Sequence, residues 1–180
     1  PVETIRQIRQ SFMVHDDDLR WLIALISDTG MRLAEAAGLH VDDIKLHEAI
    51  PYVDIKPHPW RSLKTKGSQR QVPLVGASLW AAQRIKANAS SCFAFPRYTD
   101  NSRCNANSAS NALNKWLHAN FRKDIVIHGF RHAMRDRLRA VSCPSEMIDQ
   151  IGGWSSGKVG EGYGEGYFVL HIDEWMQLLA

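Results

Sequence analysis

The chain is poor in cysteine, has no long apolar run and carries little net charge, and each shortage excludes a class of protein. Its three cysteines, Cys92, Cys104 and Cys143, are widely spaced and form no C-x-x-C pair. This pattern argues against a disulfide framework and against a zinc site of the usual spacing. The longest apolar run, Trp21–Ile26, is far too short to cross a bilayer. We therefore expect a reducing, cytoplasmic compartment and no membrane partner.

The sequence also lacks internal repeats, low-complexity tracts and any linker long enough to divide it. Its 180 residues suffice for one domain with a substantial core, so a single domain over residues 1–180 is expected. The N-terminus shows no signal-peptide pattern. Because the sequence begins at Pro1 without a methionine, we expect it to be a piece of a longer protein.

The net charge is only +3, but the positive side chains gather in two stretches. One stretch runs from Lys56 to Arg70 and the other from Arg131 to Arg139. Clustered cations are typical of proteins that bind a phosphate backbone, although charge alone leaves an ordinary solvated face equally open. The expected DNA-contacting residues are Lys56, Arg61, Lys64, Lys66, Arg70 and Arg135.

Apolar periodicity predicts an α+β chain that is mainly α-helical, with a small antiparallel sheet inserted between helices. An acidic N-cap at Asp16–Asp18 and glycines at positions 30 and 38 mark helix ends. Strand formers at 50–55 and two strands around a Lys66–Ser68 turn predict a hairpin. The expected helices span 2–12, 19–27, 31–37, 76–89, 105–121, 129–141, 144–151, 161–170 and 172–179, and the expected hairpin strands span 62–66 and 70–74.

Residues able to break a phosphodiester bond follow one another in a distinctive order. They lie in Thr29-Gly30-Met31-Arg32-Leu33-Ala34-Glu35, in Lys64-Thr65-Lys66 upstream of Val72-Pro73-Leu74, in His128-Gly129-Phe130-Arg131, in Gly152-Gly153-Trp154, and at Tyr163. Arginine forks bind phosphoryl oxygens, a lysine protonates a leaving oxygen and a phenol is a nucleophile. This order and spacing closely resemble the catalytic domain of tyrosine recombinases, the phage integrases in particular.

The resemblance implies a role for each of these side chains. The phenol of Tyr163 attacks the scissile phosphate and leaves a 3′-phosphotyrosyl link, while Lys64 protonates the departing 5′ oxygen. The remaining residues stabilise charge on the phosphoryl oxygens. Glu35 is expected to be structural, either orienting the first arginine or capping a neighbouring group. The implied catalytic residues are Arg32, Lys64, His128, Arg131, Trp154 and Tyr163. Neither a metal ion, nor ATP, nor any other cofactor is expected, because the phosphotyrosyl link stores the bond energy.

Three assignments have alternatives. Lys66 competes with Lys64 as the proton donor, and Tyr167 competes with Tyr163 because it lies one helical turn later. His128 and His132, four residues apart, have the spacing of two metal ligands on one helix face. The sequence offers no obvious third ligand, which favours the catalytic interpretation of His128.

The implied function is site-specific DNA recombination, in phage or prophage integration or excision. The implied partners are double-stranded attachment-site DNA, three further copies of the chain in a tetramer on DNA, and accessory DNA-bending proteins. The isolated piece is expected to stay monomeric, because upstream core-binding and arm-binding domains are missing from it. The terminal helix at 172–179 is expected to pack either on a neighbouring copy or on its own core. The alternatives are a type IB topoisomerase and an inactive DNA-binding prophage remnant.

Overall fold

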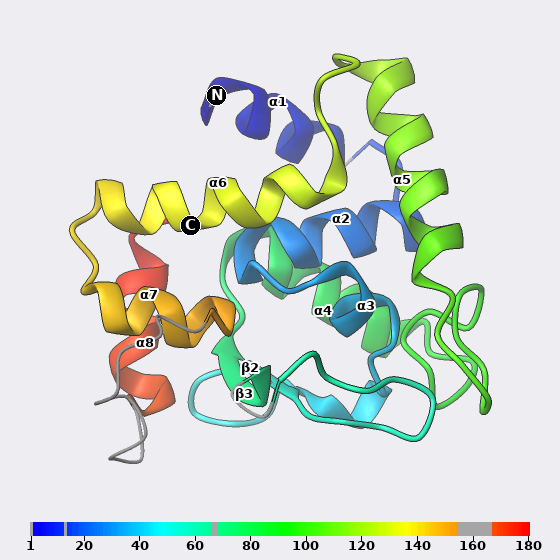
Figure 1. Ribbon diagram of the computed structural model, residues 1–180, viewed down its shortest axis with the longest axis horizontal. Helices are drawn as coiled ribbons and strands as arrows, with labels where there is room; N and C mark the ends of the chain where they lie inside the picture. The colour runs from blue at the N-terminus through cyan, green and yellow to red at the C-terminus, as the bar shows by residue number, and fades with distance from the viewer. Residues whose placement is uncertain (1, 13, 66–67, 155–166) are drawn as a thin grey trace.

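The computed structural model describes residues 2–12, 14–65, 68–154 and 167–180. Within these ranges the chain forms eight α-helices, one 3-10 helix and a three-stranded antiparallel sheet (Figure 1). The predicted fold class is therefore confirmed. The helices are α1 (Val2–Phe12), α2 (Asp18–Thr29), α3 (Leu33–Ala37), α4 (Gly76–Ala87), α5 (Ala106–Asn120), α6 (Ile127–Ala140), α7 (Ser145–Gly152) and α8 (Val169–Gln177), and the 3-10 helix is Val41–Asp43.

Helix α2 is the centre of the core, and every residue from Leu22 to Thr29 is buried. A helix that is covered all round must pack on several partners, and α2 contacts α1, α3, α4, α5 and α6. The side chain of Asp17 caps its start by accepting the N–H of Arg20, and Gly30 ends it in the left-handed conformation at φ 65°. The helix starts one residue before and ends two residues after its predicted bounds of 19–27.

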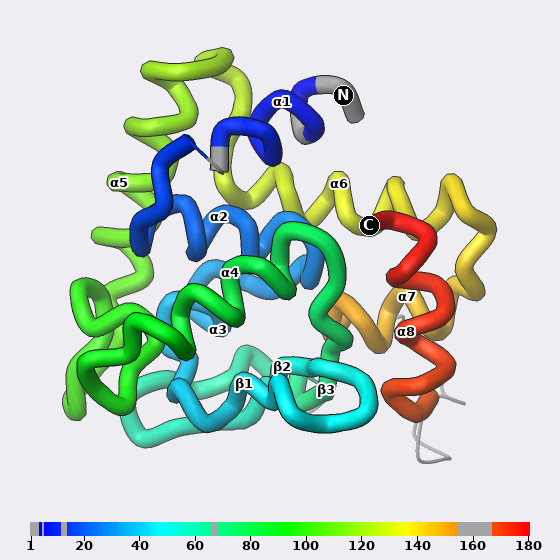
Figure 2. The backbone as a smooth tube through the Cα atoms, turned by 180° about the vertical axis from the view of Figure 1, so that it is seen from behind, coloured from blue at the N-terminus to red at the C-terminus, as the bar shows by residue number. Residues whose placement is uncertain are grey.

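The sheet lies on one side of α2 and α6 lies on the other, while α5 and the α7–α8 pair flank the two ends (Figures 1 and 2). Its strands are β1 (Ile44–Lys45), β2 (Tyr52–Ile55) and β3 (Arg70–Pro73), in the order β1-β2-β3.

The predicted hairpin between residues 62–66 and 70–74 is wrong. Strand β3 pairs instead with β2, with Val53 opposite Val72, and residues 62–65 form no strand. The reason is burial: Val53, Ile55 and Val72 are fully buried in the core, whereas the stretch at 62–65 contains Leu63 as its single apolar residue. The chain from position 56 to 69 is therefore a long connection between paired strands.

The end of the chain also differs from its prediction. The expected helix at 161–170 falls mostly outside the described residues, and α8 begins at Val169, three residues before the predicted start. Ile172 and Met176 of α8 are fully buried against the core of the same chain, so the terminal helix packs in cis. None of the described helices is long and apolar enough to span a membrane.

A buried carboxylate fastens α8 to the rest of the fold. Asp28 accepts hydrogen bonds from Arg9 (2.9 Å), from Arg137 (2.9 Å) and from the backbone N–H of Ala77 (2.8 Å). The same two arginines donate to the carbonyl of Leu179, at 3.4 Å from Arg9 and 2.8 Å from Arg137. We call these residues the Asp28 cluster; it joins α1, α2, α4 and α6 to the end of α8.

Candidate active site

Arg32 lies in the short turn between α2 and α3. It was expected in the first turn of a helix beginning at Met31, but it is the N-cap residue of α3, with extended backbone angles (φ −68°, ψ 147°). The helix starts two residues later because the hydroxyl of Thr29 and the carboxylate of Glu35 accept the N–H groups of Met31 (3.3 Å) and Arg32 (2.8 Å). Such local bonds compete with helix geometry and set the N-cap.

Three chain segments hold the guanidinium of Arg32. One terminal nitrogen donates to Glu35 (2.8 Å) and to the hydroxyl of Ser68 (3.2 Å), and the other donates to the carbonyl of Gly153 (2.8 Å). A guanidinium has five N–H bonds, so two remain without an acceptor among the described residues. The side chain is 24% exposed, so these donors can reach a ligand from solvent.

Glu35 is the buried partner of two arginines. Its oxygens accept from Arg70 at 2.9 and 3.3 Å as well as from Arg32, and the residue is 2% exposed. Burial alone would raise the pKa of Glu35, but the charge of Arg70 and hydrogen bonds from both arginines outweigh it and lower the pKa. Glu35 therefore stays ionised, and the expectation that it orients Arg32 is confirmed by these bonds.

Arg131 projects from α6 and is 4% exposed. One terminal nitrogen donates to the carbonyl of Gly30 at 2.5 Å, and the other is buried without an acceptor in the described part of the chain. Burial, followed by repulsion from Arg32 and Arg70, lowers the pKa of Arg131 to about 10. A buried donor without an acceptor is costly, and an anion bound beside Arg131 would satisfy the donor and offset the repulsion.

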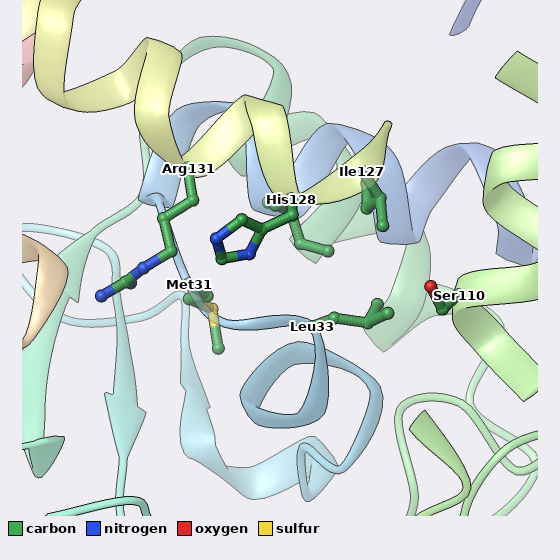
Figure 3. Close-up of a pocket in the computed structure, with 7 residues that line it drawn as sticks. Met31, Leu33, Ser110, Ile127, His128 and Arg131 are labelled. Carbon is green, nitrogen blue, oxygen red and sulfur yellow. The ribbon is translucent and has the colours of Figure 1, made fainter. Parts of the chain in front are cut away.

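His128 lies one turn before Arg131 on α6, which begins at Ile127 rather than near Gly129. Figure 3 shows both side chains extending from α6 toward the segment that carries Met31 and Leu33. Although the residue is exposed overall, desolvation on its pocket side lowers the pKa of His128, and the neighbouring His132, Arg131 and Arg32 add to the effect. A lowered pKa favours the neutral imidazole, which can accept a proton.

A small pocket opens beside the imidazole. Its cavity volume is about 150 Å³, and it lies between α2, α5, α6 and the turn before α3. The lining combines apolar side chains with three polar residues, the histidine and the arginine of α6 and a serine of α5. The lining residues are Ile26, Met31, Leu33, Ser110, Ile127, His128 and Arg131.

The metal-binding alternative finds no support in the described residues. The rings of His128 and His132 lie edge to face with centroids 4.8 Å apart. In the ranges that the structure covers, no group of three histidine, cysteine, aspartate or glutamate side chains is placed to hold an ion. The histidine pair therefore has no third ligand there.

Trp154 packs between two arginines of α6. The guanidinium carbons of Arg131 and Arg135 lie 4.4 and 5.1 Å from the centre of its indole ring. The preceding glycines make this placement possible: a Cβ on Gly152 would lie 2.0 Å from the indole, and Gly153 ends α7 at φ 59°. The tryptophan thus places an aromatic face against the guanidinium of Arg131.

The lysine segment adjoins Arg32 through Ser68. The hydroxyl of Ser68 accepts from Arg32 and lies 3.0 Å from the hydroxyl of Thr65, the neighbour of Lys64. Lys64 is exposed. Lys66 lies outside the described residues, so the choice between the two lysines stays a prediction.

The other cations expected to contact DNA differ in exposure. Lys56 is 38% exposed and pairs with Asp43, and Arg135 is 36% exposed and pairs with Asp149. Arg61 and Arg70, by contrast, are 4% and 7% exposed, so neither offers its guanidinium to an outside phosphate in this structure.

Of the two candidate nucleophiles, only Tyr167 lies within the described residues. Tyr163 lies outside the described residues, and its assignment as nucleophile stays a prediction. Tyr167 is described: its backbone N–H and carbonyl both bond the side chain of Gln150, at 2.8 and 2.7 Å. Its hydroxyl lies 3.5 Å from the carboxylate of Glu146 rather than beside an arginine of the site.

The sequence matches the phage integrase family over residues 2–165. The chain belongs to the phage integrase family. No curated protein sequence matches it. The match does not favour the type IB topoisomerase alternative.

Solved structures of the Tn1549 transposon integrase share the fold of this integrase-family chain. One, in complex with circular intermediate DNA, has a TM-score of 0.61 and 16% identity over 94% of this chain and 62% of its own. Another, with a different circular intermediate DNA, has a TM-score of 0.62 and 18% identity over 97% and 64%. A third, with transposon right end DNA, has a TM-score of 0.58 and 18% identity over 98% and 65%. The chain thus spans less than two thirds of each of these integrase chains.

Sequence reasoning missed two participants in the integrase-family site. Ser68 accepts from Arg32, and Arg70 bonds Glu35 from a buried position. No local signal marks Ser68, since a serine in a basic loop has many uses. Arg70 carried a signal that was available: it alternates with Val72 on the inward face of a strand, and inward residues are buried.

Proposed function

We propose that this chain is the catalytic domain of a tyrosine-type site-specific DNA recombinase, which cuts and rejoins double-stranded DNA through a 3′-phosphotyrosyl link. One observation carries the proposal. Two guanidinium groups, Arg32 and Arg131, converge from distant parts of the chain and retain N–H donors without acceptors among the described residues. They lie beside an imidazole whose pKa is lowered.

A phosphodiester is the ligand that best fits these donors. Its non-bridging oxygens carry one negative charge and accept several hydrogen bonds, which matches two arginine forks. The extended charge also suits the pentavalent transition state, in which more charge collects on the same oxygens. The rigid anchoring of Arg32 by Glu35 and Gly153 means that little reorganisation is needed when that charge develops.

In the proposed reaction the phenol oxygen of Tyr163 forms a bond to phosphorus as the bond to the 5′ oxygen breaks. His128 accepts the phenol proton, and Lys64, or its alternative Lys66, donates a proton to the departing 5′ oxygen. Trp154 covers the phosphate. A 5′ hydroxyl of a partner strand then reverses these steps, so bonds are exchanged without an external energy source.

Double-stranded DNA is the proposed substrate and partner, and three solved relatives of the fold are integrase–DNA complexes. The exposed cations Lys56, Lys64 and Arg135 are the proposed backbone contacts, together with Lys66. A tetramer on attachment-site DNA, accessory bending proteins and upstream DNA-binding domains complete the proposal. Its setting is the nucleoid of a bacterial cell, in phage or prophage integration or excision.

A covalent-capture experiment tests the proposal. The chain, and longer protein containing it, are mixed with nicked suicide duplexes of randomised sequence, and DNA that stays on denatured protein is sequenced. Adduct from the unaltered chain and from Tyr167→Phe, but not from Tyr163→Phe, is expected. Loss only in Tyr167→Phe would move the nucleophile to that residue. Absence of adduct from every form would contradict cleavage and leave the DNA-binding remnant.

A further inference from the structure

We propose that Arg70 is a positioning residue of this reaction: from inside the protein it sets where Arg32 holds the phosphate. This inference rests on the proposed function. The sequence groups Arg70 with the surface cations of a DNA-binding hairpin, but the structure buries it to 7% exposure on strand β3. Its role therefore has to be found among the groups that it touches inside the protein.

Four hydrogen bonds fix the guanidinium of Arg70. Its terminal nitrogens donate to the two oxygens of Glu35, at 2.9 and 3.3 Å, and to the carbonyl of Ser68 at 2.6 Å. Its Nε donates to the carbonyl of Ile151 at 2.7 Å. Arg70 thus joins α3, the connection before β3, and the end of α7.

Each group that Arg70 holds belongs to the immediate surroundings of Arg32. Glu35 bonds both the backbone and the guanidinium of Arg32. The hydroxyl of Ser68, whose carbonyl Arg70 holds, accepts from Arg32. Ile151 precedes by two residues the Gly153 carbonyl that takes the third bond from Arg32. All the described acceptors of Arg32 are therefore tied to one buried side chain.

The guanidinium of Arg70 also lies close to the backbone of Gly153. A Cβ on Gly153 would lie 2.8 Å from a terminal nitrogen of Arg70. A lysine carries a single nitrogen and has no planar fork, so it cannot bond Glu35, Ser68 and Ile151 together in this geometry. Replacing Arg70 by lysine keeps the positive charge but removes the simultaneous hydrogen bonds to Glu35, Ser68 and Ile151.

The test compares Arg70→Lys with Arg137→Lys. Arg137 is a matched control because it is a largely buried arginine, with 10% of its side chain exposed, that bonds a buried carboxylate, Asp28. It belongs instead to the Asp28 cluster at the end of α8. Single-turnover cleavage, DNA affinity and unfolding in urea are measured for both variants. Arg70→Lys should slow cleavage roughly 100-fold with little change in DNA affinity, since a misplacement of about 1 Å costs that much. Arg137→Lys should lower stability without this loss of rate.

Two further readouts separate positioning from a merely structural role. In an Arg32→Lys background, Arg70→Lys should cost little more, because the two changes remove one shared function. On a duplex whose leaving 5′ oxygen is replaced by sulfur, which needs no acid, the Arg70→Lys defect should persist. If the sulfur-substituted duplex fully restored the cleavage rate of Arg70→Lys, the defect would lie in proton donation by the lysine segment, and the proposal would be overturned. Additive losses of rate in the double variant would overturn it as well.

A binding measurement keeps the inference separate from the proposed function. Inorganic phosphate is titrated into each variant and followed by the backbone amide NMR signals of Gly153 and Trp154. Arg70→Lys should weaken phosphate binding severalfold, and Arg137→Lys should leave it unchanged. If the unaltered chain binds phosphate but forms no adduct, the recombinase proposal fails while this titration still decides the role of Arg70. Equal phosphate affinity in all three proteins would contradict the inference.

Discussion

Two buried carboxylates, seven positions apart in the sequence, each hold a pair of arginines, yet they serve different ends. Asp28 binds Arg9 and Arg137, and Glu35 binds Arg32 and Arg70. In each pair one arginine is about a quarter exposed: Arg9 at 25% and Arg32 at 24%. Burial and pairing alone therefore do not distinguish a structural cluster from a functional one.

The two clusters differ in how the arginines use the N–H groups that do not bond the carboxylate, and in the charge nearby. In the Asp28 cluster both arginines converge on the backbone carbonyl of Leu179. Near Glu35 a further arginine, Arg131, adds a positive charge that the carboxylate does not balance, and repulsion from Arg32 and Arg70 contributes to lowering the pKa of Arg131. Uncompensated charge, rather than ion pairing, marks the site where an anion belongs.

The largest expected effect is on stability. Asp28→Ala leaves the charges of Arg9 and Arg137 without their carboxylate, and breaking such a buried pair costs about 3–5 kcal/mol of unfolding free energy. Equilibrium unfolding in urea measures the loss. A change under about 0.5 kcal/mol, the range of ordinary surface substitutions, would show that the Asp28 cluster does not stabilise the fold.

Arg131→Gln, in contrast to Asp28→Ala, should lower the cleavage rate far more than the stability. The glutamine keeps part of the packing on Trp154 but removes the positive charge and a donor to the phosphate, so cleavage should fall about 100- to 1000-fold. Stability should change by much less than in Asp28→Ala, because relief of repulsion with Arg32 offsets the lost bond to Gly30. Single-turnover rates and urea midpoints are compared for the two variants, and equal destabilisation would contradict the distinction.

The pH dependence of cleavage should report His128. Because its pKa is lowered, the imidazole stays neutral at pH 7, and the rate should fall about tenfold per pH unit only below that pKa. The unfolded chain binds the proton at a higher pH than the folded chain, so stability also decreases as the pH falls through about 6.5. His128→Gln should flatten both dependences. A rate that already declines above pH 7 would show that another group titrates.

The smallest expected effect is stabilisation by phosphate. An anion that binds the folded state at ten times its Kd adds about 1.4 kcal/mol to the unfolding free energy. This gain should disappear in Arg131→Gln and persist in Arg9→Lys, which alters the Asp28 cluster instead. Thermal unfolding with and without phosphate, at constant ionic strength, measures it. A gain retained in Arg131→Gln would place the anion elsewhere.

Local features of the fold could be predicted from the sequence, and features that depend on distant contacts could not. The acidic cap at Asp17 and the left-handed Gly30 set the ends of α2 within two residues of their predicted places. The partner of β3 was missed because turn residues near Lys66 suggested a hairpin, whereas burial of Val72 against Val53 selects β2 across a long connection.

The residues of the candidate site also divide into those that local motifs locate and those whose place depends on distant contacts. Motif spacing located Arg32, His128, Arg131 and Trp154, which the structure brings together around Gly30 and Gly153. Positive charge placed Arg70 on the surface although its alternation with Val72 indicated burial, and only the distant contact with Glu35 explains how that charge is held inside. The catalytic roles of the four residues that motif spacing located, and those of Lys64 and Tyr163, stay predictions.

The Asp28 cluster also makes the first and last described helices mechanically dependent on each other. Arg9 of α1 and Arg137 of α6 pull on one carbonyl, that of Leu179 just beyond α8. The guanidinium of Arg9 therefore links α1 directly to the end of α8, in addition to the packing of α8 on β3. Shortening the chain before Leu179 would remove this shared acceptor, and Arg9 and Arg137 would then be held by Asp28 alone within the cluster.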